Sequence, residues 1–423
     1  MRSLWFVIVV LLIIIVGSIV YVYIMAGYSF EKVSELSSLS TSSKYSTTPS
    51  VVCDKIDLVD VAKVFGFDLY RYVVKYRGYA DNIVVSPYNL FEALLMLYEG
   101  SNTTTREEIA NVLGIDSRCD IWVFYSKLRN LILEGAGNAT LELGSGIWIR
   151  DRFYRYVRHE YIENLVKFFK SIVREFSKED ELVNDVNSYI ENKTHGLIKR
   201  PLRREMVDFR TVVLLVTTLY FKAFWEKPFR PTIIVFESIE GSMKEVQGME
   251  RYGEFYVYED NDLVAVAIPY KNSSYEFLIF MPKKIENFKN FVENLSIDKI
   301  HRIIEKMKPR GIELAIPKFE IETKLEDIHR VLEAMGIREV FKPYVADLTK
   351  MANVKKGDIY VDRIIHAAKI KVYEKGTEAA AATIIIIKET ALRPSIVINK
   401  PFVFMIIHKD LELPLFIGQI TSL

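Results

Sequence analysis

Six histidines and two cysteines are the side chains of this 423-residue chain that could most readily do catalytic or metal chemistry, and none has the spacing that such chemistry needs. His159-Glu160 lacks the second histidine of a zinc-protease helix. Gly135-Ala-Gly137 continues as Asn-Ala-Thr rather than as a dinucleotide-binding loop, and no Gly-x-Ser-x-Gly nucleophile turn occurs. The sequence therefore predicts a protein that is not an enzyme and uses no cofactor or metal. The histidines are His159, His195, His301, His329, His366 and His408.

The stretch from Glu374 to Pro394 carries a different kind of chemistry, which is conformational. Gly376 and the small residues after it cost little free energy to order in more than one conformation, and the isoleucines Ile384 to Ile387 favour a β-strand. We expect either an ordinary core strand or a segment that can be both an exposed loop and an inserted strand. In a strand, one face would be free of charge and could lie on an apolar core. That face would hold Thr377, Ala379, Ala381, Thr383, Ile385 and Ile387.

The elements around this stretch must position it, and several of them carry recognisable motifs. Ser86-Pro87 is typical of a helix start, with a capping serine and a proline in the first turn. Together with four other groups of residues, this motif resembles the serpin family over nearly all of residues 51–423. The groups are Asn82-Ile-Val-Val-Ser-Pro87; Asn187, Tyr189, Thr194 and Gly196; Phe221 to Phe229, with Ala223 in place of the usual glycine; Asn399-Lys-Pro-Phe402; and Pro414-Leu-Phe-Ile-Gly418.

The resemblance implies an α+β serpin fold with three β-sheets, about eight to nine helices and an exposed reactive-centre loop. It also implies a monomer that inhibits serine proteases by a suicide mechanism. A protease attacks the loop, forms an acyl-enzyme, and is trapped when the cut loop inserts into the main sheet. The hinge of that loop would comprise Glu374, Gly376, Thr377, Glu378, Ala379, Ala380, Ala381, Ala382 and Thr383.

The reactive bond follows from alignment with the family. Counting on from the counterpart of Glu374 and back from that of Asn399 gives the same bond, Thr390–Ala391. A threonine at this position implies a target protease of the subtilisin or elastase type. Lys388 and Arg393 lie close by, so a shifted cut is the alternative.

A second group of residues would lie where the main sheet opens to admit the loop. In a strand-like segment a lone histidine is usually a structural one, and the resemblance assigns His366 to a hydrogen-bonded cluster beneath the sheet. Thr217 stands where the family usually has asparagine, and Trp225 would lie at the top of the opening or be plain core. The whole cluster would comprise Ser86, Asn89, Thr217, His366 and Trp225.

The amino-terminal part has a separate composition. Leu4 to Met25 carries no charge and is long enough to span a membrane as a helix. We therefore expect three parts: a transmembrane anchor or signal segment at 1–27, a Ser/Thr-rich linker at 28–50 and a serpin domain at 51–423. The membrane would be a partner through the first part, with the amino terminus inside and the domain at the extracellular face. A secreted protein is the alternative.

The overall charge points to no further partner. With 56 lysines and arginines against 55 aspartates and glutamates, no nucleic-acid binding is expected. Basic residues between Arg150 and Lys178 are predicted to be solvated helix faces. Cys53 and Cys119 either pair or stay as buried thiols. Two other function classes stay open: a non-inhibitory carrier or chaperone, and a tethered adhesion or scaffold protein.

Overall fold

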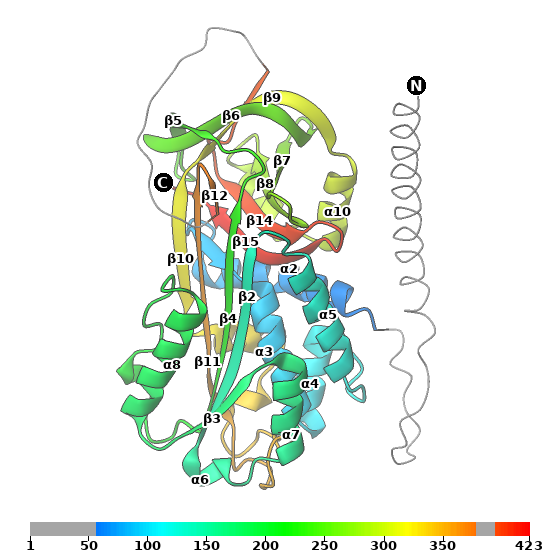
Figure 1. The fold of residues 1–423 in the computed structure, drawn as a ribbon, viewed down its shortest axis with the longest axis vertical. Coiled ribbons are helices and arrows are strands. Elements are labelled where there is room, and N and C mark those ends of the chain that lie inside the picture. Colours follow the sequence, from blue (N-terminus) through cyan, green and yellow to red (C-terminus); the bar gives the residue numbers. More distant parts are fainter. Residues whose placement is uncertain (1–55, 378–393) are drawn as a thin grey trace, which may run out of the picture. The chain divides into compact units, whose positions relative to one another are not determined.

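The computed structural model describes residues 56–377 and 394–423, which all belong to one compact unit, Val52–Leu423. Helices and strands are mixed along this unit, so the predicted α+β class is confirmed (Figure 1). The helices in the described residues are α2 (Leu58–Arg77), α3 (Pro87–Gly100), α4 (Thr103–Leu113), α5 (Trp122–Glu134), α6 (Asp151–Tyr154), α7 (His159–Asn164), α8 (Glu179–Lys193), α9 (Asn287–Glu293), α10 (Ile297–Glu305) and α11 (Ile328–Met335).

The first of two sheets has nine strands. Seven neighbouring pairs run in the order β1 (Ile83–Val85), β15 (Leu413–Ile420), β14 (Phe402–His408), β8 (Tyr275–Pro282), β7 (Leu263–Pro269), β6 (Met243–Glu259), β9 (Lys308–Pro317) and β13 (Ser395–Val397), and β5 (Arg230–Glu237) pairs with β6. The sequence predicts three sheets, whereas the described strands form two. The reason is the length of β6, which bonds to β5 and β9 along most of its course and to β7 at its end.

The second sheet has six strands and contains the first residues of the Glu374–Pro394 segment. Its order is β10 (Phe319–Leu325), β11 (Val361–Tyr373), β12 (Gly376–Thr377), β4 (Val213–Phe224), β2 (Thr140–Arg150) and β3 (Ile172–Phe176).

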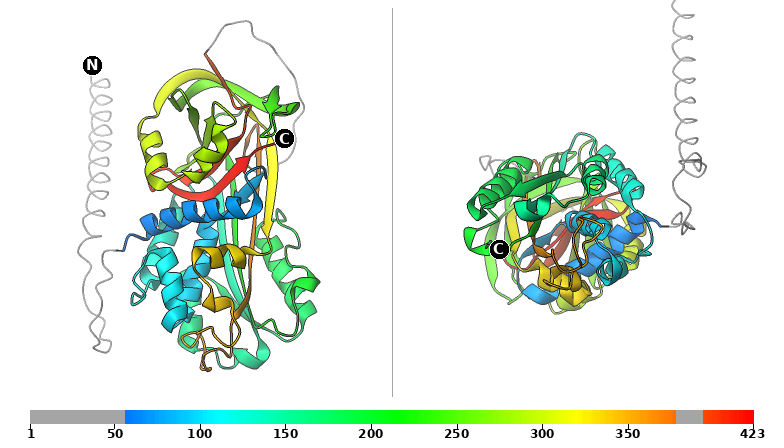
Figure 2. Two further views of the ribbon diagram at one scale, coloured as in Figure 1. Left: turned by 180° about the vertical axis from the view of Figure 1, so that it is seen from behind. Right: turned by 90° about the horizontal axis from the view of Figure 1, so that it is seen from below.

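Strand β4 is buried on both of its faces, which explains its unbroken apolar sequence. Leu214 and Val216 pack in one cluster with Leu182 of α8, whereas Leu215 belongs to the main core, which also contains α3. Helix α8 and the group of helices that includes α3 therefore cover opposite faces of the six-stranded sheet (Figures 1 and 2).

The expected membrane-spanning helix is not upheld. Within residues 56–377 and 394–423 no helix is long and apolar enough to cross a membrane. The longest of them, α2, carries Asp60 in its first turn and Lys75 and Arg77 in its last. Segment 1–27, to which the span was assigned, lies outside the described residues. The prediction of a transmembrane helix, of a membrane partner and of a single-pass location at the extracellular face is corrected accordingly, and the division at residues 27 and 50 stays a prediction.

The described residues include one of the two cysteines. Cys119 is buried and disulfide-bonded. Cys53, the other cysteine in the sequence, lies outside the described residues.

Candidate functional site at the hinge of the six-stranded sheet

Strand β12 is only two residues long and lies between β11 and β4. Gly376 and Thr377 pair with Tyr373 and Val372 of β11 on one side, and with Phe224 and Ala223 of β4 on the other. Lower in the sheet, β11 and β4 pair directly with each other in parallel, from Val361↔Val213 to Ile365↔Val216. A Cβ on Gly376 would lie 2.0 Å from the carbonyl oxygen of Ala223, so the close approach of the two backbones requires glycine.

Thr377 is held by aromatic side chains above the core. Its side chain is 1% exposed, and its hydroxyl lies 2.6 Å from the hydroxyl of Tyr270. Tyr270 stacks on Trp225 with ring centres 4.7 Å apart. The Trp225 indole donates to the carbonyl oxygen of Tyr373 at 2.9 Å, which ties the end of β4 to the end of β11. Trp225 therefore lies at the hinge end of the sheet.

Glu374 anchors the turn that leads from β11 into β12. Its carboxylate lies 3.0 Å from the ammonium of Lys318, and its carbonyl oxygen accepts from the backbone N–H of Phe229 at 2.8 Å. Both side chains of the ion pair are largely buried, with exposures of 9% for Glu374 and 18% for Lys318. Removing one partner from such a pair leaves a charge in a poorly solvated place, which is costly.

We expect a double-mutant cycle to reveal this coupling. Lys318→Met leaves the Glu374 carboxylate unpaired and should lower the free energy of unfolding by about 3 kcal/mol. Glu374→Gln, which keeps an acceptor for Lys318, should cost about 1 kcal/mol. The double variant should cost less than the sum of the two, as read from urea unfolding; additive costs would show that the pair does not stabilise the turn.

Four of the predicted cluster residues meet lower down, where β11 and β4 are not paired with each other. Ser86 does not cap α3 with its hydroxyl; instead its backbone N–H donates to Nε2 of His366 at 3.4 Å. Asn89, with its amide oriented to suit its neighbours, donates to the carbonyl oxygen of Thr218 at 3.2 Å and accepts from the N–H of Leu219 at 2.8 Å. Asn89 thus satisfies part of the backbone of β4.

Three buried polar atoms at this place have no hydrogen-bond partner among the described residues. They are the hydroxyl oxygens of Ser86 and Thr217 and Nδ1 of His366. Burial lowers the pKa of His366 to about 4, so the imidazole is neutral at neutral pH. Because Nε2 accepts a hydrogen bond, Nδ1 must carry the hydrogen and is a donor without an acceptor. Such a group costs free energy until it finds one.

The structure thus separates the predicted residues into two groups. Glu374, Gly376, Thr377 and Trp225 lie at the hinge end, and Ser86, Asn89, Thr217 and His366 lie beside the unpaired part of β11 and β4. Glu378, Ala379, Ala380, Ala381, Ala382, Thr383, Thr390 and Ala391 lie outside the described residues.

Sequence reasoning missed Tyr270 and Lys318, which contact the hinge from distant parts of the chain. Neither has a local signal, because Tyr270 reads as the start of a turn after Pro269 and Lys318 as one polar residue between two strands. Within the described residues, no group of three or more His, Cys, Asp or Glu side chains could hold a metal ion.

Comparison with known proteins places this architecture in one family. The family described as serpin (serine protease inhibitor) matches residues 60–423. The chain therefore belongs to the serpin family, and the resemblance seen in the sequence is confirmed.

Individual relatives are distant but cover most of the chain. An uncharacterized serpin-like protein of Methanosarcina acetivorans is 28% identical over 390 residues, 87% of each chain. The native structure of tengpin, a thermophilic serpin, matches with a TM-score of 0.77 and 22% identity, covering 90% of this chain and 96% of that one. Thyroxine-binding globulin in complex with thyroxine also matches with a TM-score of 0.77 and 22% identity, covering 86% and 99%. At such identities the structural matches bear on the fold alone.

Proposed function

We propose that this serpin inhibits a serine protease by inserting its cleaved loop, from Thr377 onward, between β11 and β4. The observation that carries the proposal is that β12 already lies between these strands at one end. Beyond Thr377 the two strands face each other without pairing until Ile365 and Val216. Among the described residues, no pairing between β11 and β4 occupies this stretch, so a strand that continued from β12 could pair with both.

The register of β12 predicts where each hinge residue would arrive. Each step along the inserted strand moves one residue back along both β11 and β4, because β12 is antiparallel to both. Continued from Thr377 opposite Val372 and Ala223, this register brings Thr383 opposite His366 and Thr217. All three side chains would then be on the face that Thr377 already presents to the core, since side chains alternate along a strand.

This arrival would supply the missing hydrogen-bond partner. A threonine hydroxyl both accepts and donates, so Thr383 could accept from Nδ1 of His366 and donate to the hydroxyl of Thr217. Two of the three buried polar atoms, Nδ1 of His366 and the hydroxyl oxygen of Thr217, would thereby be satisfied in the inserted state. Ala379 and Ala381, which precede Thr383 on the same face, carry no charge to desolvate.

In the proposed reaction the protease serine attacks the carbonyl carbon of Thr390. An ester bond forms between the serine oxygen and Thr390, the bond from Thr390 to the Ala391 nitrogen breaks, and the serine proton ends on the new amino group of Ala391. Insertion of the loop then carries the bound protease away before water can hydrolyse the ester. A threonine before the cut bond favours a protease with a small or broad pocket, of the elastase or subtilisin type.

The test is to mix the full chain with a panel of subtilisin-, elastase-, chymotrypsin- and trypsin-like proteases. We expect a complex that survives a denaturing gel, together with a released peptide that begins at Ala391 by mass spectrometry. The cleaved protein should unfold at a higher temperature than the intact one. Thr390→Arg is the matched variant and should move complex formation from the elastase-like to the trypsin-like protease.

Two outcomes would contradict parts of the proposal. Cleavage by every protease, without a complex and without a gain in thermal stability, would exclude inhibition by insertion and favour the carrier or chaperone class. A complex with a different new terminus would keep the mechanism and move the reactive bond, with Lys388 and Arg393 as the neighbouring alternatives.

A further inference from the structure

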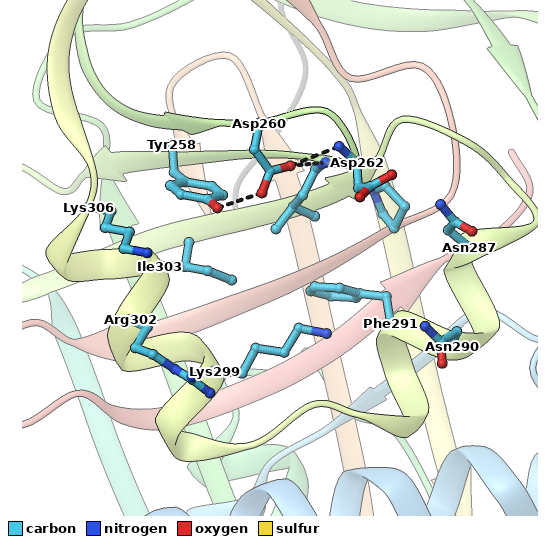
Figure 3. A pocket seen from close by; sticks show the side chains of 12 residues that line it. Tyr258, Asp260, Asp262, Asn287, Asn290, Phe291, Lys299, Arg302, Ile303 and Lys306 are labelled. Atoms are coloured by element: carbon cyan, nitrogen blue, oxygen red, sulfur yellow. Dashed lines mark hydrogen bonds between the residues drawn. The ribbon is translucent and has the colours of Figure 1, made fainter.

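A cavity of about 640 Å³ lies between the β6–β7 hairpin, α9 and α10 (Figure 3). Its volume is in the range of small-molecule sites, roughly 300 to 1,000 Å³. None of the hinge or sheet-opening residues lines it. The cavity is therefore a separate site from the hinge and the sheet opening.

One wall of the cavity is cationic. Lys299, Arg302 and Lys306 of α10 and its end line it, and their spacing of three and four residues places them along one side of the helix (Figure 3). Arg302 donates from Nε to the carbonyl oxygen of Asp298 at 3.0 Å, which leaves its terminal amino groups for a ligand.

Lys299 is the cation placed deepest in this wall. Its ammonium lies 4.3 Å from the ring centre of Phe291 on α9. Burial lowers the pKa of Lys299, and no carboxylate of the described residues contributes to that pKa. A half-buried cation against an aromatic ring, with no ion-pair partner among the described residues, favours an anion from outside the chain.

The acidic residues of the opposite wall do not supply that anion. Asp260 accepts from the hydroxyl of Tyr258 at 2.5 Å and from the backbone N–H groups of Asp262 and Leu263 at 2.8 Å. Both of its oxygens are thus engaged within the hairpin. Asp262 is exposed, and the three cations of the lining outnumber the two carboxylates.

The rest of the lining is mixed, with Asn287 and Asn290 of α9 among its polar side chains. Leu263, Phe291 and Ile303 lie in the cavity wall and are each less than 10% exposed. We propose that this cavity binds a small organic anion, with its acid group on Lys299 and Arg302 and its apolar or aromatic body against Phe291 and Ile303. An inorganic anion would use only the cations, and a neutral aromatic molecule only the apolar wall.

Titration calorimetry on the full chain with 2-naphthoate tests the proposal. We expect saturable binding, at least tenfold weaker binding of the neutral 2-naphthamide and of inorganic sulfate, and at least a tenfold loss of naphthoate affinity in Lys299→Met. The matched control is Lys289→Met on α9, because Lys289 lies near Glu293 and the ring of Tyr79 and does not line the cavity. Its affinity for naphthoate should equal that of the natural sequence.

A second measurement needs no variant. Lysines are labelled with acetic anhydride and read by mass spectrometry, and 2-naphthoate should protect Lys299 but not Lys289. The proposal is overturned by an absence of saturable binding, by sulfate or naphthamide binding as tightly as naphthoate, by an unchanged affinity in Lys299→Met, or by equal protection of the two lysines. None of these results would bear on the protease complex, which has its own gel assay.

Discussion

A Thr377→Arg variant is expected to be cleaved by the target protease without trapping it. Thr377 is 1% exposed in β12 and bonded to Tyr270, so we expect an arginine there to leave the sheet in the intact protein. Insertion of the cleaved loop would then have to bury an unpaired charge. A penalty of about 3 kcal/mol in the insertion step would slow insertion roughly 100-fold. Hydrolysis of the acyl-enzyme would then be faster than insertion of the loop. The measurement is the ratio of complex to free cleaved protein on a denaturing gel.

The control separates loss of insertion from loss of fold. Thr377→Ser keeps the hydroxyl for Tyr270 and adds no charge, so it should still form mostly complex. The rate of loop cleavage should be similar in both variants, because the substitution is far along the chain from Thr390–Ala391. Abundant complex with Thr377→Arg would mean that trapping does not need this residue to enter the sheet.

The second large effect concerns pH. Burial holds the pKa of His366 at about 4 in the folded protein, against a usual value of about 6.5 when unfolded. Below about pH 6.5, His366 therefore binds a proton in the unfolded chain but stays neutral in the folded protein. The folded state loses stability as the pH falls toward 4. The loss from this one residue should approach about 3 kcal/mol and should vanish above about pH 7.

His366→Gln tests that expectation, because glutamine does not titrate and can still accept from the N–H of Ser86. The difference in urea midpoint between the natural protein and the variant, measured at about pH 7.5 and about pH 4.5, isolates the contribution of His366. His159→Gln changes the same residue type at an exposed position and should leave the pH dependence unaltered. Equal pH dependence in the natural protein and His366→Gln would show that the imidazole can be protonated in place.

The start of the hinge shows both what is local and what is not. Thr377 is buried on the uncharged face that simple alternation predicts, whereas Gly376 is required by the carbonyl of Ala223 on a distant strand. The start of α3 at Pro87 follows from the fixed backbone of proline, even though Ser86 does not cap it with its hydroxyl. The segment to which the membrane span was assigned, 1–27, lies outside the described residues, and no helix within them is long and apolar enough to span a membrane.

The sequence by itself determined the serpin family, the α+β class, and the run of small residues that follows Gly376. These depend on residue type and short spacing, which a linear pattern records. Only the tertiary structure decided which groups contact Glu374 and Thr377. Lys318 contacts Glu374, and Tyr270 contacts Thr377, although each pair is far apart in the chain. The polar atoms of Ser86, Thr217 and His366 that lack hydrogen-bond partners lie where the pairing of β11 with β4 ends. Such contacts arise from strand register and packing between distant segments, and no local pattern encodes them.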